Sequence, residues 1–182
     1  MYKPPYWFFK NIKFPEIEID HVIHTLNTIP SSPYEEDNSD GAFMVTSYFL
    51  EEKNRPDKIW SKQYSEIHEE LFKQIGLYAT CQYEFMYWSQ FYRKGNKHTP
   101  HHHYNPKDDG SVILSWVHFI RSPYKGFRFV DKDGKYFVPP EQEDGDLICF
   151  PSYLWHEAIP NPKDKQRLVV AGNIILIHLD TP

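Results

Sequence analysis

The sequence has few cysteines, no long apolar run and no excess of positive charge. Its two cysteines, Cys81 and Cys149, each lie inside an apolar, strand-like run, where a small buried thiol is more common than a disulfide. No run approaches the roughly 18 apolar residues of a membrane span, and the first residues lack a signal-peptide pattern. We therefore expect a soluble, cytoplasmic protein without a membrane partner.

The net charge of −5 provides no basic surface of the kind that nucleic-acid binding normally requires, so nucleic acid is not an expected partner. Aromatic residues are abundant by contrast, at 17% of the chain, and 15 prolines indicate many turns. Aromatic residues favour strands, and the composition predicts a β-rich fold. A length of 182 residues fits a single domain, 1–182, with a core of its own.

The first part of the chain mixes extended and helical patterns. Residues 1–15 alternate aromatics with lysines and prolines, as an edge strand would. Apolar positions in 16–28 predict a helix that Pro30 ends, and the polar residues 29–42 have the composition of a loop. The short aromatic and β-branched run 43–50 predicts a strand.

The clearest helical pattern begins near Asp57 and ends at Gly76. Its apolar residues recur every three or four positions and form one stripe: Trp60, Tyr64, Ile67, Leu71 and Ile75. His68 lies one residue off this stripe, so we expect it at the surface and not in a site.

After Gly76 the pattern changes to that of strands. Strands are predicted at 81–92, 111–120, 127–130, 135–138, 146–150 and 167–178, with Asp133-Gly134 as a hairpin turn. Helices followed by short antiparallel strands predict a barrel or sandwich with helices outside it. We expect residues 1–80 to support a strand core formed by 81–180.

Four histidines crowd into six residues, from His98 to His103, in the middle of the chain. Imidazole is the commonest ligand for transition metals. In an extended strand His101 and His103 point to one face and His102 to the other. A third ligand must come from elsewhere, and His156 follows a predicted strand. Imidazole binds metal only when neutral, so metal affinity is expected to fall below about pH 6.5.

The spacing of Tyr92, Gly95, His98, His101 and His103 resembles the Tyr-x-x-Gly-x-x-Tyr-x-x-His-x-Asp pattern of the prolyl-4-hydroxylase-like Fe(II)/2-oxoglutarate-dependent oxygenases. A later series also resembles this family: Gly145-Asp146, then His156, then Arg167. The resemblance covers about residues 81–178. Gly145-Asp146 itself is expected to be a turn without a chemical role.

The resemblance implies a double-stranded β-helix, or jelly-roll barrel, that binds Fe(II) through His101, His103 and His156. It implies 2-oxoglutarate as cosubstrate, O2 as oxidant and a prime substrate that the motifs do not identify. Arg167 would pair with the distal carboxylate of 2-oxoglutarate, because Arg is a rigid, permanently charged donor. Tyr92 and His98 would line the cosubstrate pocket.

His103 departs from the family pattern, which has an acidic residue there. Asp108 or Asp109 could supply a carboxylate instead, and His98 could face solvent rather than the pocket. His102, His118 and His178 are expected outside the site, His118 and His178 at the edge of the core or at the surface.

Two other functions remain open. The spacings from Gly95 to His101 and from Pro151 to His156 also fit a cupin metalloenzyme that does not use 2-oxoglutarate. A non-catalytic metal-binding β-barrel module is the third interpretation. For the barrel oxygenase, the pocket is expected at the barrel mouth near four aromatic residues: Trp88, Trp116, Tyr153 and Trp155.

Overall fold

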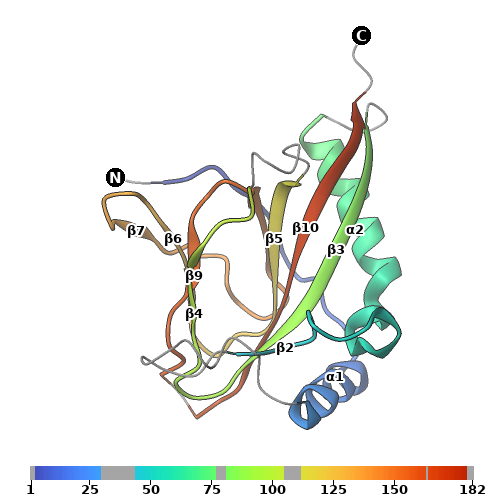
Figure 1. The fold of residues 1–182 in the computed structure, drawn as a ribbon, viewed down its shortest axis with the longest axis vertical. Helices are drawn as coiled ribbons and strands as arrows, with labels where there is room; N and C mark the ends of the chain where they lie inside the picture. The colour runs from blue at the N-terminus through green and yellow to red at the C-terminus, as the bar shows by residue number, and fades with distance from the viewer. Residues whose placement is uncertain (1–2, 30–43, 77–80, 105–111, 163, 180–182) are drawn as a thin grey trace.

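The computed structural model describes residues 3–29, 44–76, 81–104, 112–162 and 164–179 (Figure 1). The helices and strands are β1 (Trp7–Phe9), α1 (Glu16–Thr28), β2 (Val45–Thr46), α2 (Ser61–Gln74), β3 (Cys81–Tyr92), β4 (His98–His101), β5 (Val112–Arg121), β6 (Phe127–Val130), β7 (Tyr136–Phe137), β8 (Leu147–Pro151), β9 (His156–Ala158) and β10 (Arg167–Leu179). Short 3-10 helices at Glu52–Asn54 and Pro56–Trp60 precede α2.

The strands form two antiparallel sheets. The larger sheet has the order β1-β8-β5-β10-β3-β2, and the smaller has the order β4-β9-β6-β7. The expected mainly β architecture with flanking helices is confirmed, although the two sheets do not close into a continuous barrel. The expected edge strand near the N-terminus is β1, which pairs with β8.

Both faces of the larger sheet are buried. Side chains alternate along its long central strands, so each strand contributes residues to the packing on both faces. On β10, Val169 and Ala171 face the smaller sheet, whereas Leu168 and Val170 pack into the core beneath the helices. Two apolar clusters result, one between the sheets and one between the larger sheet and the helices. Burial on both faces explains why the predicted strands read as nearly continuous apolar runs.

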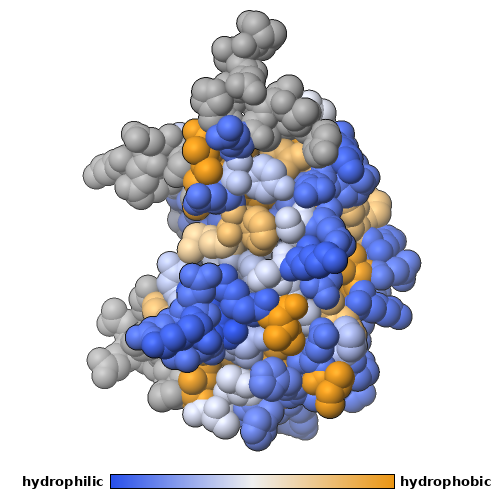
Figure 2. All heavy atoms as spheres, turned by 90° about the vertical axis from the view of Figure 1, so that its right-hand side faces the viewer, coloured by the Kyte–Doolittle hydropathy of each residue, from blue (hydrophilic) through white to orange (hydrophobic). Residues whose placement is uncertain are grey.

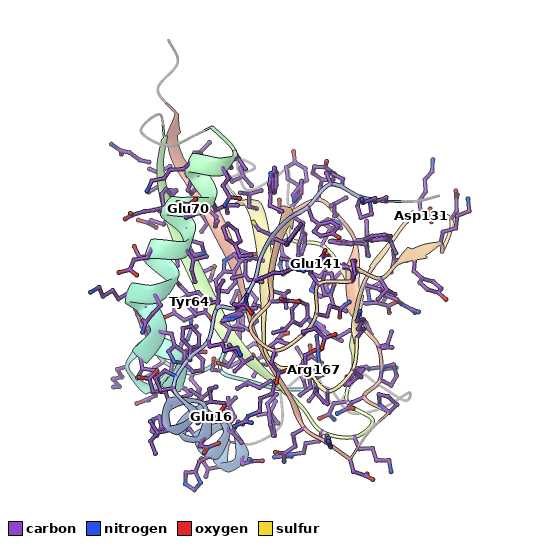
Figure 3. All side chains as sticks on the ribbon, turned by 180° about the vertical axis from the view of Figure 1, so that it is seen from behind. Glu16, Tyr64, Glu70, Asp131, Glu141 and Arg167 are labelled. Atoms are coloured by element: carbon purple, nitrogen blue, oxygen red, sulfur yellow. The ribbon has the colours of Figure 1, made fainter. Side chains whose placement is uncertain are left out.

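Helix α2 covers the outer face of the larger sheet beside β3 and β10 (Figure 1). Two residues of α2 show its two sides: Tyr64 is fully buried on the side that faces the sheet, whereas Glu70 is exposed on the outer side (Figure 3). Hydrophilic residues dominate the side of the molecule that carries the helices (Figure 2). The helix predicted over 16–28 is confirmed as α1. The stretch from Pro56 to Trp60, predicted as the first turn of α2, is a 3-10 helix instead.

The prediction that His68 lies at the surface is wrong. The buried residues of α2 are Tyr64, His68, Leu71 and Phe72, so the buried stripe is rotated slightly from the predicted one. His68 is 1% exposed, and its ring packs edge-on against Phe85 and Trp116. Neither of its ring nitrogens has a hydrogen-bond partner among the residues that the structure describes. Burial lowers the pKa of His68 to about 3, and the ring is neutral at physiological pH.

His118 is also more deeply buried than expected. It is fully enclosed beneath α2, where its Nε2–H donates to Ile12 O and its Nδ1 accepts from Tyr64 Oη, both at 2.9 Å. Both ring nitrogens are therefore satisfied, and His118 has a structural role away from the histidine cluster.

The strand predicted over 43–50 is shorter than expected. Only Val45–Thr46 pairs with β3, because the chain turns at Ser47, whose carbonyl accepts from Leu50 N. The side chain of Ser47 donates to the buried carboxylate of Asp57, which also accepts from Ser89 N at 2.6 Å. This network ties the turn to β3. The loop predicted over 29–42 lies almost wholly outside the described residues.

Two local predictions are confirmed. Asp133-Gly134 forms the turn between β6 and β7, with Gly134 at a φ of +75°. Gly145, with a φ of +90°, forms a turn before β8. Cys149 is a buried free thiol in β8, whereas the side chain of Cys81 lies outside the described part. None of the described helices is both long and apolar enough to cross a bilayer.

Candidate metal centre

Two short strands bring distant histidines together. β4 and β9 pair antiparallel in the smaller sheet, and their register sets His101 directly opposite His156. Directly opposed residues project their side chains to the same face of a sheet. The two imidazole rings are accordingly 4.3 Å apart between centroids. The sequence did not predict β9, because a three-residue strand has too few positions to show a periodicity.

His103 completes the cluster from just beyond β4. The candidate ligand atoms of His101, His103 and His156 all lie within 4.8 Å of one another. His102 is exposed on the opposite side, with its ring edge-on to Trp155 at 4.6 Å. The alternation expected of an extended segment is therefore confirmed. Three imidazoles converge on one point, and no described carboxylate belongs to the group.

Hydrogen bonds fix the tautomers of two of these rings. Nδ1–H of His101 donates to Thr99 O at 2.8 Å, and Nδ1–H of His156 donates to Leu154 O at 2.9 Å. A carbonyl oxygen can only accept, so the proton must lie on Nδ1 in both neutral rings. Each Nε2 then carries a free lone pair. This arrangement is the one by which proteins orient metal-binding histidines.

Burial keeps the three imidazoles neutral. Loss of solvation lowers the pKa of His101 and His156, and it lowers that of His103 to about 3. Positive charge on one ring would further disfavour protonation of its neighbours. The fall in metal affinity expected below about pH 6.5 for unperturbed histidines is therefore shifted to lower pH. At neutral pH all three rings are ready to bind a cation without releasing protons.

Arg167 lies in the interior, at the start of β10 and opposite Tyr92 of β3 (Figure 3). Its side chain is 1% exposed and lines the same cavity as the three histidines. Among the described residues, its Nε and Nη1 have no hydrogen-bond partner, and no Asp or Glu forms an ion pair with it. A buried, unpaired cation costs several kcal/mol. An anionic ligand would remove that cost.

Aromatic rings surround the guanidinium. The centroids of Tyr92, Phe119 and Tyr124 lie 4.8, 5.7 and 5.7 Å from the guanidinium carbon of Arg167. Burial raises the pKa of both tyrosines, so each keeps its proton at neutral pH. Tyr92 donates to Gln90 Oε1 at 3.0 Å. In this part of the pocket wall, three aromatic rings therefore surround the positively charged guanidinium of Arg167.

Tyr124 is a residue that the sequence did not point to. Its hydroxyl is buried and lacks a hydrogen-bond partner, as do the two nitrogens of Arg167. It lies in the turn between β5 and β6, outside every spacing that marked the other residues. The Tyr124 hydroxyl and the Arg167 guanidinium therefore lie close enough to interact, and both groups can donate to an oxyanion.

His98 lines the cavity rather than facing solvent. Its ring stacks on that of His101, with centroids 3.9 Å apart, although it is not one of the three convergent ligands. Burial lowers the pKa of His98 well below its usual value. It therefore adds a fourth neutral imidazole to the cavity wall.

Other predicted residues are distributed differently. Trp88 and Trp116 line the cavity, but Tyr153 and Trp155 are exposed, at 57% and 47%, and line neither cavity at the histidines. The alternative carboxylates, Asp108 and Asp109, lie outside the described residues, as does the side chain of His178.

Comparison with known proteins supports the fold. Neither a protein-family model nor a curated protein sequence matches the chain. Solved structures do. A prolyl-4-hydroxylase from Pseudomonas putida is 13% identical with a TM-score of 0.64, over 93% of this chain and 92% of its own. The viral collagen prolyl hydroxylase of Paramecium bursaria Chlorella virus-1, solved with 2-oxoglutarate, is 14% identical with a TM-score of 0.62, over 95% and 96%.

A third match is an α-ketoglutarate-dependent, non-haem epimerase of nogalamycin biosynthesis, SnoN. It is 13% identical with a TM-score of 0.66, over 93% of this chain and 78% of its own. Identity this low establishes a shared fold and not a shared activity. The expected double-stranded β-helix is therefore confirmed, and the function must be argued from the site.

Proposed function

We propose that this protein is an Fe(II)- and 2-oxoglutarate-dependent oxygenase, a hydroxylase in its simplest form. The reaction consumes a substrate C–H bond, O2 and 2-oxoglutarate, and it yields the C–OH product, succinate and CO2. One oxygen atom enters the product and the other enters succinate. The proposal depends on one observation: three convergent imidazoles and a buried guanidinium without a carboxylate partner line the same cavity.

The donor set fits a transition metal. Three neutral imidazoles suit iron, zinc, copper or nickel, so the histidines alone do not select among them. In our proposal His101, His103 and His156 would hold the ion, which would supply a site for the cosubstrate and O2. His103 stands where the family has an acidic residue, so the protein ligands carry no negative charge. A site of this kind favours an anionic cosubstrate.

Arg167 distinguishes the proposed oxygenase from a simple metal site. 2-Oxoglutarate has a carboxylate at each end, and Arg167 would pair with the one distant from the metal. The Tyr124 hydroxyl would donate a second hydrogen bond. Tyr92 would support the guanidinium with its ring, and His98 would line the space between the guanidinium and the metal. Iron and cosubstrate, when bound, supply the oxidising chemistry, and these residues position the cosubstrate.

A cupin-type metalloenzyme is the second candidate, since its histidine spacing is also present. It would bind a metal at the same three histidines, but it gives no reason for a buried Arg167. A non-catalytic metal module likewise leaves that cation unexplained. Both alternatives predict that 2-oxoglutarate does not bind. The cytoplasmic location expected from the sequence remains a prediction.

The proposal is tested by supplying purified protein with Fe(II), ascorbate, O2 and 2-oxoglutarate and by measuring succinate by mass spectrometry. We expect slow, metal-dependent formation of succinate even without a prime substrate. Arg167→Ala should abolish it at low 2-oxoglutarate, whereas a substitution of the exposed Tyr136 should not. Metal binding without any 2-oxoglutarate binding or turnover would favour the cupin alternative.

A further inference from the structure

A second cavity, larger than the one that Arg167 lines, lies beside the histidines and has a volume of about 220 Å³. It shares part of its lining with the Arg167 cavity, including His101, His103 and Trp88. Arg167 is absent from its wall. If the proposed function holds, the cosubstrate lies between the histidines and Arg167, and this larger cavity is the space that remains next to the metal for the molecule to be oxidised.

The wall of this larger cavity is aromatic. Tyr48 meets both Phe49 and Trp88 edge-on, with centroids 5.0 Å apart in each pair. Tyr48 and Phe49 are 41% and 45% exposed, so they form the mouth, while Trp88 is buried next to His103. The thioether side chain of Met86 adds an adaptable apolar surface. A flat apolar ring fits such a wall through edge and face contacts.

Two buried amides give the cavity a specific polar character. Gln90 Oε1 accepts from Tyr92 Oη, and Asn173 Oδ1 accepts from Ser115 Oγ at 2.9 Å. Because the oxygens are used in this way, each amide has its NH2 group left to donate. No described residue accepts a hydrogen bond from either nitrogen. Both side chains line the cavity, at 5% and 6% exposure, so both can donate to a ligand.

The cavity lacks charge. Among the described residues that line it, none is Lys, Arg, Asp or Glu. A charged ligand would lose its hydration there, and the two amide donors would replace little of it, whereas a neutral acceptor gains the same hydrogen bonds at a smaller desolvation cost. An apolar cavity of roughly 150 Å³ is enough for a benzene ring. A space of about 220 Å³ therefore accommodates one ring with a small substituent.

From these observations we propose that the prime substrate presents a neutral aromatic ring that carries a hydrogen-bond acceptor, such as a carbonyl oxygen. The ring lies against Trp88 and Tyr48, and the acceptor receives hydrogen bonds from Gln90 and Asn173. A C–H bond on or beside the ring is then held next to the three histidines. This inference rests on the proposed function for the reaction, but the recognition of the ring depends only on the cavity.

Three isosteric probes test this recognition: benzamide, which is neutral, benzoate, which is an anion, and benzamidine, which is a cation when protonated. Binding is measured by chemical-shift changes in ¹H–¹⁵N NMR spectra, on the metal-free protein and again with the diamagnetic ion Zn(II) and 2-oxoglutarate. We expect benzamide to bind to the metal-free protein at least tenfold more tightly than either charged probe, with shifts at Trp88 and at the amides of Gln90 and Asn173. Binding to the metal-free protein does not depend on the oxygenase proposal. Failure of benzamide to bind there would therefore count against this inference alone.

Two variants test the residues. Asn173→Leu should weaken benzamide about three- to tenfold, as expected for one lost hydrogen bond. Asn173 also accepts a hydrogen bond from Ser115, so its substitution could disturb the interior. Tyr48→Ala is therefore a second variant, at an exposed residue, and it should lower the affinity for benzamide at least threefold. Tyr136→Ala, an exposed aromatic residue on β7, is the matched control and should change nothing. Equal affinities of the three probes, or benzamide affinity unchanged in Tyr48→Ala, would overturn the inference.

A fourth probe, the capped peptide acetyl-Gly-Phe-Gly-amide, tests whether the ring belongs to a peptide or to a free small molecule. Tighter binding of either the peptide or benzamide is consistent with the cavity chemistry. Tighter binding of the peptide than of benzamide assigns the ring to a protein or peptide side chain. Tighter binding of benzamide assigns it to a free small molecule. Binding of neither probe overturns the proposal.

Discussion

His101 and His156 are direct cross-strand partners, and their rings lie 4.3 Å apart. Two of the three candidate metal ligands are thus held by the sheet itself, and His103 follows directly after β4. A change in register by one residue would turn one histidine to the opposite face. The pairing of β4 with β9 in this register is therefore required to bring His101 and His156 together.

Removing one ligand should abolish tight metal binding. We expect His103→Ala to lose more than about a hundredfold in Mn(II) affinity by calorimetry, because even partners that only orient a ligand contribute about 10- to 100-fold. His102→Ala is the matched control, since this neighbouring histidine points away from the site. Equal losses in the two variants would show that the metal does not bind at the proposed face.

Arg167→Ala should weaken 2-oxoglutarate binding by roughly ten- to a hundredfold, which corresponds to about 1.5–3 kcal/mol for a charge-assisted hydrogen bond. Mn(II) affinity should stay unchanged, because the guanidinium is not among the convergent ligands. Arg167→Lys keeps the charge but not the planar fork, and an intermediate loss is expected. Calorimetric titration of the Mn(II)-loaded variants measures both quantities. Wild-type cosubstrate affinity in Arg167→Ala would mean that another group anchors the carboxylate.

Tyr124→Phe tests the residue that only the structure revealed. The substitution removes one buried hydroxyl without a partner and keeps the ring beside Arg167. Loss of one hydrogen bond to a carboxylate should reduce 2-oxoglutarate affinity about threefold or more. Without cosubstrate the variant should be as stable as wild type, or more stable, because the unsatisfied hydroxyl is gone. An unchanged affinity would exclude Tyr124 from the cosubstrate pocket.

His68 should make the metal-free protein sensitive to acid. Its pKa is about 3 in the folded state and about 6.5 when unfolded, so only the unfolded state takes up a proton as the pH falls below 6.5. The free energy of unfolding should therefore fall, by about 2 kcal/mol at pH 5 from this residue alone. Above pH 6.5 neither state is protonated, and His68 contributes no pH dependence.

Urea denaturation at pH 7.5 and pH 5 measures this effect. The difference in unfolding free energy between the two pH values should be about 2 kcal/mol smaller in His68→Leu than in wild type. A substitution of His24, which is exposed on α1, is the matched control and should leave the difference unchanged. If His68→Leu shows the full wild-type difference, His68 is not buried as described.

Much of the fold could be predicted because the long strands carry strong local signals. β3, β5 and β10 are apolar along most of their length, and their predicted bounds differ from the observed ones by at most one residue. The two-residue β2 and the three-residue β9 could not be predicted in the same way, because pairing with neighbours defines them. The position of His68 was missed for a related reason: a rotation of α2 by a fraction of a turn is set by tertiary packing.

Alternation along a strand predicted that His101 and His103 share a face, whereas His156 was assigned to the site through its position after a predicted strand and through the family resemblance. The buried state of Arg167 agrees with its expected role but was not visible in the sequence. Tyr124, Gln90 and Asn173 carried no signal, since single polar residues in a turn or strand acquire meaning only from what surrounds them. Their unsatisfied donors are a property of the assembled structure.

The most direct test of the account is an anaerobic crystal structure of the protein with Mn(II) and 2-oxoglutarate. We predict one metal ion bound by nitrogen atoms of His101, His103 and His156 at roughly 2.0–2.2 Å, with the distal carboxylate of 2-oxoglutarate on Arg167. A metal bound through a different set of residues, or a 2-oxoglutarate carboxylate away from Arg167, would contradict it.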